Sequence, residues 1–202
     1  MNELEASAEP RLRKPGFAEE ALPWLEAVFR FSLRLAGGIE DEARDLTQET
    51  FLRAYRHWDT YARGTSCRSW LFTICRNAFL RQEERRGRRP EVPESQLDYK
   101  VEALASTRVL DGLRAEDPER RFFESIMDRE VTAALAKLPV EFREAVVLGD
   151  LDGLPYAEIS AVLGVPVGTV KSRIYRGRRL LASELHDYAR KMGYLSGDRR
   201  CT

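Results

Sequence analysis

The sequence predicts an all-α protein made of two small helical domains joined by a flexible linker. Apolar residues recur at helical spacing in two blocks, residues 17–90 and 125–188. No segment alternates apolar and polar residues with the period of two that a half-buried strand requires. Between the blocks, residues 91–124 combine prolines with many charges and little periodicity, which is typical of a linker.

The N-terminal block contains three predicted helices, at about residues 19–36, 41–58 and 67–86. Gly37-Gly38 ends the first helix, and the small polar segment 63–66 precedes the third. Short connections between these helices predict a compact bundle. Residues 1–16, which are polar and include Pro10 and Pro15, are expected to form a disordered tail.

The C-terminal block contains four predicted helices. The first begins near Ser125 and is ended by Pro139, the second continues to about Leu148, and two shorter ones span about 155–163 and 167–186. Gly164 is expected to adopt a left-handed cap conformation, which with Val165-Pro166 makes a tight corner. This pattern predicts a helix-turn-helix, with the tail 189–202 left unassigned.

The last predicted helix has two contrasting faces. Its apolar residues form one narrow stripe, and the opposite face is polar and cationic, as a helix in the major groove of DNA requires. The alternative is an ordinary surface helix with a solvated basic face. The absence of any acid in residues 165–180 disfavours that alternative, because surface helices normally mix charges of both signs. The stripe comprises Val167, Val170, Ile174, Gly177 and Leu181.

Charge is strongly segregated although the formal net charge is +0. Residues 61–90 contain eight arginines and two glutamates, and residues 165–180 contain five basic side chains and no acid. The rest of the chain is acidic. Two compact basic patches on an acidic background predict two separate contacts with a polyanion.

The basic segment 61–90 also has the composition of a single-stranded nucleic-acid site. Thr73, Arg76 and Asn77 are expected to project from the polar face of the helix 67–86, and Tyr61 supplies a ring just before it. Tyr61 is equally compatible with base stacking and with packing, whereas Trp70 is expected in the core. The apolar face of this helix comprises Trp70, Leu71, Ile74, Cys75 and Ala78.

No catalytic, metal or cofactor site is predicted. The three cysteines form no C-x-x-C pair, the two histidines are far apart, and there is no glycine-rich phosphate loop. Cys67 and Cys75 are expected to be buried, reduced thiols rather than a redox pair. Without a signal-like start or a long apolar run, the chain is expected to be cytoplasmic.

Several motifs, taken in order, resemble those of extracytoplasmic-function (ECF) sigma factors, members of the sigma-70 family. The N-terminal block contains DLTQETF at residues 45–51 and SWLFTICRN at residues 69–77. The C-terminal block contains LPVEFR at residues 138–143, LPYAEI at residues 154–159 and GTVKSR at residues 168–173. Their order and spacing, with a linker between the two groups, make the resemblance specific.

The resemblance implies a division of labour between a region 2 domain (17–90) and a region 4 domain (125–188). Region 2 would bind the clamp coiled coil of the largest polymerase subunit and would melt and capture the promoter −10 element. Region 4 would read the −35 element as duplex and contact the flap of the second-largest subunit. The implied polymerase-binding residues are Asp45, Leu46, Gln48 and Glu49. Those implied at −10 are Tyr61, Arg63, Thr65, Arg68, Thr73, Arg76, Asn77 and Arg81. Those implied at −35 are Thr169, Lys171, Ser172, Arg173, Arg176 and Arg179.

The resemblance also implies partners beyond promoter DNA and core RNA polymerase, namely an anti-sigma factor, together with a role in a stress response. In the free chain, the two domains are expected to pack on each other or on an inhibitor until polymerase holds them apart. The alternative function is a free-standing helix-turn-helix regulator that binds duplex DNA without polymerase. It accounts for residues 155–186 but not for the second basic patch. An RNA-binding or RNA-modifying enzyme is disfavoured by the missing catalytic signatures.

Overall fold

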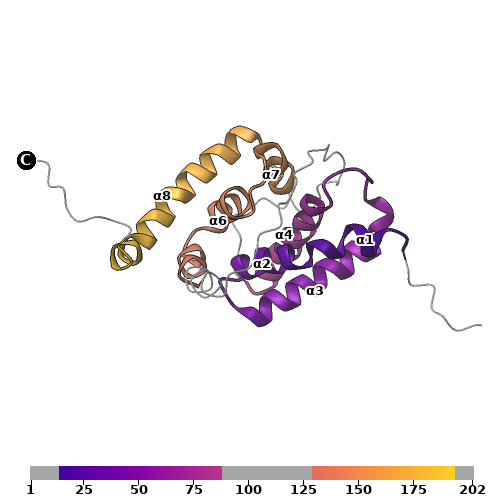
Figure 1. Ribbon diagram of the computed structural model, residues 1–202, viewed down its shortest axis with the longest axis horizontal. Coiled ribbons are helices and arrows are strands. Elements are labelled where there is room, and N and C mark those ends of the chain that lie inside the picture. Colours follow the sequence, from indigo (N-terminus) through magenta and orange to yellow (C-terminus); the bar gives the residue numbers. More distant parts are fainter. Residues whose placement is uncertain (1–13, 88–128, 194–202) are drawn as a thin grey trace, which may run out of the picture.

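The computed structural model describes residues 14–87 and 129–193, and all regular secondary structure in these ranges is helical (Figure 1). The helices form an N-terminal and a C-terminal domain, which confirms the predicted fold class. The predicted linker 91–124, most of the N-terminal tail and most of the C-terminal tail lie outside the described residues.

The N-terminal domain is built on three longer helices, α2 (Leu25–Leu35), α3 (Glu40–Arg56) and α4 (Cys67–Arg85), with short α1 (Phe17–Glu20), η1 (Leu22–Trp24) and η2 (Trp58–Thr60) around them. Gly37 and Gly38 have φ of 69° and 90°, left-handed values that allow the tight turn between α2 and α3. Ser66 caps α4 by accepting a hydrogen bond from the Ser69 backbone N–H.

The predicted first helix is wrong in one respect, because it is divided into α1, η1 and α2. Pro23 explains the division, since proline has no N–H for a helical hydrogen bond and disfavours helical geometry at Leu22 before it. The chain therefore makes a short 3₁₀ turn over Leu22–Trp24 before α2 begins.

The C-terminal domain consists of a helix over residues 129–136, α6 (Val140–Val146), α7 (Tyr156–Leu163) and α8 (Val167–Lys191). A π turn, η4 (Val147–Leu151), follows α6 directly. Gly164 has φ of 65°, as expected for its left-handed cap, and α7 and α8 form the predicted helix-turn-helix corner. α8 continues past its predicted end near residue 186.

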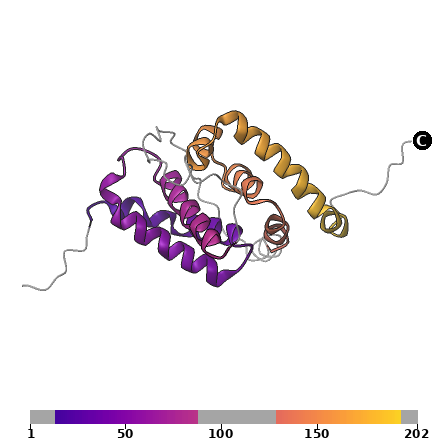
Figure 2. The same ribbon diagram turned by 180° about the vertical axis from the view of Figure 1, so that it is seen from behind.

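The two domains pack against each other. Figures 1 and 2 show α2 and α4 facing the C-terminal domain, with α3 on the far side of the N-terminal domain and α8 on the far side of the C-terminal domain. One cluster of buried apolar side chains runs through both domains. We call this arrangement the closed form.

Helices α6 and α8 approach very closely at Gly177. A Cβ added to Gly177 would lie 2.5 Å from Val146 Cγ2 and 3.1 Å from the Phe142 carbonyl oxygen, so no side chain fits there. This contact sets the position of α8 on the domain. The glycine therefore serves close packing and not a turn.

We expect Gly177→Ala to destabilise the C-terminal domain by about 1–3 kcal/mol, because the methyl group forces α6 and α8 apart. Denaturant unfolding monitored by circular dichroism measures this loss. Gly168→Ala on the same helix is the matched control. Its added Cβ would meet no atom within 4 Å, so its stability should be unchanged or raised by up to about 1 kcal/mol. Equal stability of the two variants would contradict the packing argument.

Candidate nucleic-acid interface

The first candidate surface is the outward face of α8. Val170, Ile174 and Gly177 of the predicted apolar stripe are buried against the domain, although Val167 at the start of the helix is exposed. The opposite face is cationic and open. Of the residues implied at −35, Lys171, Ser172, Arg176 and Arg179 are exposed, and Thr169 and Arg173 are half-buried.

One arginine of α8, Arg178, forms an ion pair within the C-terminal domain. Arg178 donates from Nε to Asp150 Oδ2 (2.9 Å) and from Nη2 to Asp150 Oδ1 (2.5 Å). Such a two-pronged pair fixes the guanidinium group on the π turn. Arg178 is therefore engaged within the domain, whereas Arg176 projects from the exposed face.

The second candidate surface, on α4, is largely covered in the closed form. Arg76 and Thr73, which were expected on an open polar face, are buried, and Arg76 is only 1% exposed. The expectation is wrong because α4 is covered on two sides, by its own bundle and by the C-terminal domain. Arg76 Nε lies 3.0 Å from Oε2 of Glu144, which is 0% exposed.

Other polar contacts join the same face of α4 to the C-terminal domain. Arg68 donates from Nη2 to the Asp152 carbonyl oxygen (2.7 Å), and its guanidinium lies 5.2 Å from the Phe72 ring centroid. Ser69 Oγ donates to Glu158 Oε2. Ser69, Arg68 and Arg76 therefore all contact the C-terminal domain along one side of α4.

Asp152 lies at the centre of this junction, just after the π turn. Arg34 and Arg68 both approach its Oδ1, at 3.7 Å and 3.4 Å. Burial raises the pKa of Asp152, and the two arginines oppose that rise. A further arginine, Arg143, spans the junction by donating to the Leu35 carbonyl oxygen at the end of α2 (2.7 Å). The junction thus combines buried charges with the apolar cluster that runs through both domains.

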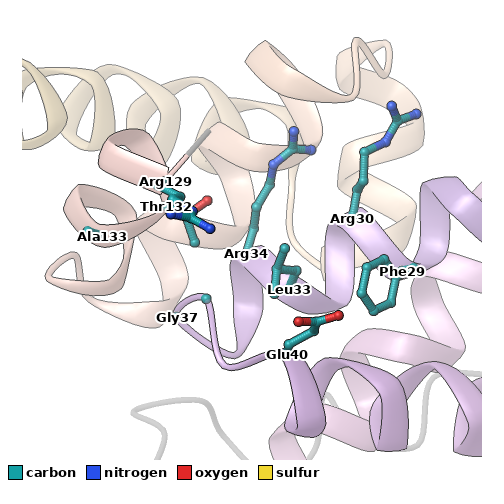
Figure 3. Close-up of a pocket in the computed structure, with 10 residues that line it drawn as sticks. Phe29, Arg30, Leu33, Arg34, Gly37, Glu40, Arg129, Thr132 and Ala133 are labelled. Atoms are coloured by element: carbon teal, nitrogen blue, oxygen red, sulfur yellow. The ribbon is translucent and has the colours of Figure 1, made fainter. Parts of the chain in front are cut away.

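A cleft of about 590 Å³ opens beside this junction. It lies between α2, the Gly37-Gly38 turn and the helix 129–136, so it is formed by both domains. Figure 3 shows the Arg30 and Arg34 side chains extending from α2 towards the C-terminal domain, with Phe29 and Leu33 from the same helix nearby. A cationic and partly apolar cleft of this kind exists only while the domains are packed together.

The remaining residues implied at −10 lie in the segment before α4, at its middle and near its end. Tyr61 packs, since its ring stacks on Trp58 with centroids 4.8 Å apart and its hydroxyl donates to the Thr65 carbonyl oxygen. Burial raises the pKa of Tyr61 to about 12. Arg63 is exposed and donates to the Pro15 carbonyl oxygen. Asn77 and Arg81 are partly exposed.

The residues implied for polymerase binding all lie on α3 but differ in their exposure to solvent. Asp45 and Gln48 are exposed, and Glu49 is half-buried and accepts from Arg53 Nε (2.6 Å). Leu46 belongs to the core at 1% exposure, which corrects its predicted role as a contact residue.

Leu52, which the motif did not include, is 46% exposed on the same helix. It lines a groove of about 410 Å³ between α3 and α4 together with Asp45, Gln48 and Arg81. Its spacing of four residues from Gln48 is the signal that places both on one helical face.

No cluster of three histidine, cysteine, aspartate or glutamate side chains in residues 14–87 and 129–193 is arranged to hold a metal ion. Within the same ranges, no helix combines the length and apolar character needed to cross a membrane.

Comparisons with known proteins match both domains. Residues 22–89 match the family model for Sigma-70 region 2, and residues 128–181 match that for Sigma-70, region 4. The ECF RNA polymerase sigma factor SigE of Mycolicibacterium smegmatis is 42% identical over 179 residues, covering 88% of this chain and 63% of that protein. The ECF RNA polymerase sigma factor EcfG of Rhodopseudomonas palustris is 37% identical over 166 residues, covering 82% and 81%.

Solved structures show the same architecture. The sigma factor RpoE from Bartonella quintana, solved in complex with the anti-sigma factor NepR, is similar with a TM-score of 0.62 at 29% identity, covering 86% of this chain and 98% of that chain. CnrH, solved in complex with the cytosolic domain of CnrY, is similar in fold with a TM-score of 0.57 at 23% identity, covering 87% and 90%.

The two thiols of the N-terminal domain, Cys67 and Cys75, are buried. Burial raises the pKa of Cys75 to about 11, with a Ser32 hydroxyl 3.3 Å from its sulfur, and raises that of Cys67 to about 12. Both thiols are therefore protonated at neutral pH, and the thiolate is the reactive form.

In a Cys201→Ser background, which keeps only these two of the three cysteines, we expect slow reaction with a disulfide reagent at pH 8. From ionisation alone, Cys75 should react roughly two and Cys67 roughly three orders of magnitude more slowly than a free cysteine. The colour released by the reagent measures the rate, and denatured protein supplies the control in which both thiols react fast. Rapid labelling of either thiol in the native chain would contradict the burial argument.

Proposed function

Because the chain belongs to the ECF group of the sigma-70 family, we propose that it binds core RNA polymerase and directs it to specific promoters. The observation that supports this most directly is that regions 2 and 4 occur in order in one chain, each with a cationic helix, α4 and α8. The family consists of non-enzymatic initiation factors. Activity therefore depends on differential binding of DNA and polymerase.

We propose that α8 recognises the −35 element as duplex. Its apolar face is held by α6 and α7, and its outward face offers hydroxyl, ammonium and guanidinium groups that suit base edges and phosphates of the major groove. Arg176 is an exposed donor in the middle of this face. Because Arg178 is engaged by Asp150, we assign the −35 contact to Arg176 and its neighbours Lys171 and Arg179.

We propose that α4 and the loop before it bind the −10 element. Asn77 and Arg81 are partly exposed in the closed form. Arg76 would become available only when the domains separate, because the C-terminal domain covers it, and Arg68 would then be released from Asp152. Polymerase would supply that separation by holding the domains at the spacing of the two promoter elements. Two modest contacts held at a fixed distance reinforce each other through effective concentration.

We propose that core polymerase is bound through the groove between α3 and α4. Asp45 and Gln48 present acceptors and an amide, and Leu52 adds an exposed apolar side chain to the same groove. This face lies away from the C-terminal domain (Figure 1), so it is open in the closed form. The flap contact of region 4 and control by an anti-sigma factor, as in the complex of the Bartonella quintana relative, complete the set of proposed partners.

If the chain functions as proposed, only the mixture of this chain with core polymerase should select sequences from a forked promoter library. The mixture should enrich a two-part motif with a fixed spacer, and Asn77→Ala should relax its downstream half. Sequencing of the bound pool at matched salt compares the mixture with either component alone. If the chain alone enriches a symmetric duplex site and polymerase adds nothing, it is a conventional regulator.

Arg176→Ala should weaken holoenzyme binding to the selected promoter by roughly tenfold or more, since one base contact is worth about 1–3 kcal/mol. The loss should be concentrated in the upstream half of the motif. Arg178→Ala is the matched control, because it removes an equal charge from the same helix but one that Asp150 already engages. Equal losses from the two variants would show that α8 acts only through its net charge.

A further inference from the structure

We propose that the N-terminal strap, residues 14–17, positions the loop 61–66 for the −10 element, so that Phe17 and the Pro15 carbonyl group act as positioning residues in promoter recognition. The inference rests on the proposed function, because it concerns the loop before α4 that we assign to −10 binding. The strap lies outside every motif of the sequence analysis. It also precedes the match to region 2, which begins at residue 22.

An aromatic cluster seats the strap on the end of α3. The Phe17 ring packs edge-on against the rings of Tyr55 and Trp58, with centroids 5.1 Å apart in both pairs. Edge-to-face contacts of this kind stabilise beyond the area that they bury. Lys14 Nζ also donates to Asp59 Oδ2 (2.5 Å), but the Asp59 carboxylate is exposed, and such a pair contributes little. Phe17 is therefore the main anchor of the strap.

The Pro15 carbonyl oxygen connects the strap to the loop. It accepts one hydrogen bond from Trp58 Nε1 (3.0 Å) and one from Arg63 Nη2 (3.2 Å). A carbonyl oxygen has two lone pairs, so both of its acceptor positions are used. Trp58 in turn supports Tyr61, whose ring stacks on the indole with an interplanar angle of 23°. One backbone group of the strap thus holds the support of the first loop residue and the arginine near the loop tip.

Gly16 gives the strap the bend that these contacts need. Its φ is 81°, in the left-handed region that glycine adopts without strain. The Pro15 carbonyl group is thereby directed at Arg63, while Phe17 begins α1 and packs on α3. A Cβ on Gly16 would lie 3.7 Å from Arg63 Nη2, so the strap passes directly beside the loop.

The loop is ordered at its ends and open at its tip. The Tyr61 hydroxyl donates to the Thr65 carbonyl oxygen (2.8 Å), which closes the loop, and Ser66 caps α4. Residues 62–64 are exposed between these anchors, and a Cβ on Gly64 would meet no atom within 4 Å. A site that is ordered before its ligand arrives loses little conformational freedom on binding. The strap therefore favours DNA binding by holding the loop in one conformation.

The strap should act on the downstream half of the promoter alone. Figure 1 shows α1, which follows the strap, far from α8 along the long axis of the molecule, so the strap is remote from the −35 surface. Of the described residues, those that line the proposed polymerase groove include none from the strap. Release of the strap should therefore spare core binding and −35 selection, which a general loss of folding would not do.

The test compares holoenzymes formed with wild-type chain, Phe17→Ala and Leu22→Ala. Phe17→Ala removes the anchor of the strap. Leu22→Ala is the matched control, because Leu22 is an apolar residue of the same N-terminal segment but is 47% exposed. Each holoenzyme is titrated onto a forked promoter, single-stranded in its downstream half, with fluorescence anisotropy as the readout. Selection from the promoter library and affinity for core polymerase are measured for the same chains.

We expect the Phe17→Ala holoenzyme to bind the forked promoter roughly three- to tenfold more weakly than wild type, as the loss of order in one or two loop side chains implies. Its selection should be relaxed in the downstream half and unchanged in the upstream half, with core affinity unchanged. Leu22→Ala should match wild type in all measurements. Unchanged fork binding by folded Phe17→Ala would overturn the proposal. Equal losses in both promoter halves, or with Leu22→Ala, would also overturn it.

A double-mutant cycle tests whether the strap acts through the loop. Arg63→Ala removes the hydrogen bond from the loop to Pro15. If the strap acts through this connection, Phe17→Ala should weaken fork binding less in the Arg63→Ala background than in wild type, because both changes break the same link. Losses that simply multiply would show that Phe17 and Arg63 act independently, and the proposal would be wrong.

A second variant, Gly16→Val, decides the question if circular dichroism shows that Phe17→Ala does not fold. A β-branched residue is strongly disfavoured at φ of 81°, so the strap must leave its place while α2, α3 and α4 keep their own packing. Gly87→Val is its control, because Gly87 has φ of 70° at the other end of α4 from the loop. Gly16→Val should weaken fork binding and relax the downstream half, and Gly87→Val should do neither. Unchanged binding by Gly16→Val would contradict the proposal.

Failure of this proposal is separable from failure of the proposed function. If wild-type chain with core polymerase selects a two-part promoter while the strap variants select it equally well, the function stands and the role of the strap is wrong. If the wild-type mixture selects no promoter, the proposed function fails, and the positioning role of the strap falls with it.

Discussion

The buried pair of Arg76 and Glu144 is the interaction on which the closed form depends. A charge that is removed from water must meet an opposite charge, and here each domain contributes one of the two. Breaking such a pair by removing one partner costs roughly 3–5 kcal/mol, more than an exposed ion pair contributes. The pair therefore selects one docking of the domains, and the contacts of Arg68, Ser69 and Arg143 follow along the same junction.

In the C-terminal domain, close packing at Gly177 and the Arg178–Asp150 pair fix the position of α8. Gly177 lets α8 lie directly on α6, and the π turn after α6 directs Asp150 towards Arg178 and Asp152 towards the N-terminal domain. An extra residue in a helical turn is a common way to re-aim side chains at functional positions. One short segment thus anchors α8 on one side and contacts region 2 on the other. The cationic face of α8 stays open while that of α4 is largely covered.

Much of the fold could be predicted because helices leave local signals. Apolar spacing located the main helices, Gly164 marked the corner of the helix-turn-helix, and the acid-free stretch 165–180 marked the cationic face of α8. One incorrect prediction has a local cause, and two others have a cause that lies far away along the chain. Pro23 divides the first predicted helix, which apolar spacing alone does not indicate. The motif predicted a contact role for Leu46, and the helical face predicted exposure for Arg76. Neither the motif nor the face indicates which neighbouring element covers a residue.

The sequence by itself determined the helical class, the two-domain plan and the two contrasting faces of α8, because each follows from the spacing of nearby residues. Only the tertiary structure decided that the domains pack together and which cations remain open. Arg76 and Arg176 look alike in sequence, as arginines on polar faces of basic helices. One is buried against Glu144 and the other is exposed, because the availability of a charge depends on the surface opposite it, which is contributed by residues far away along the chain.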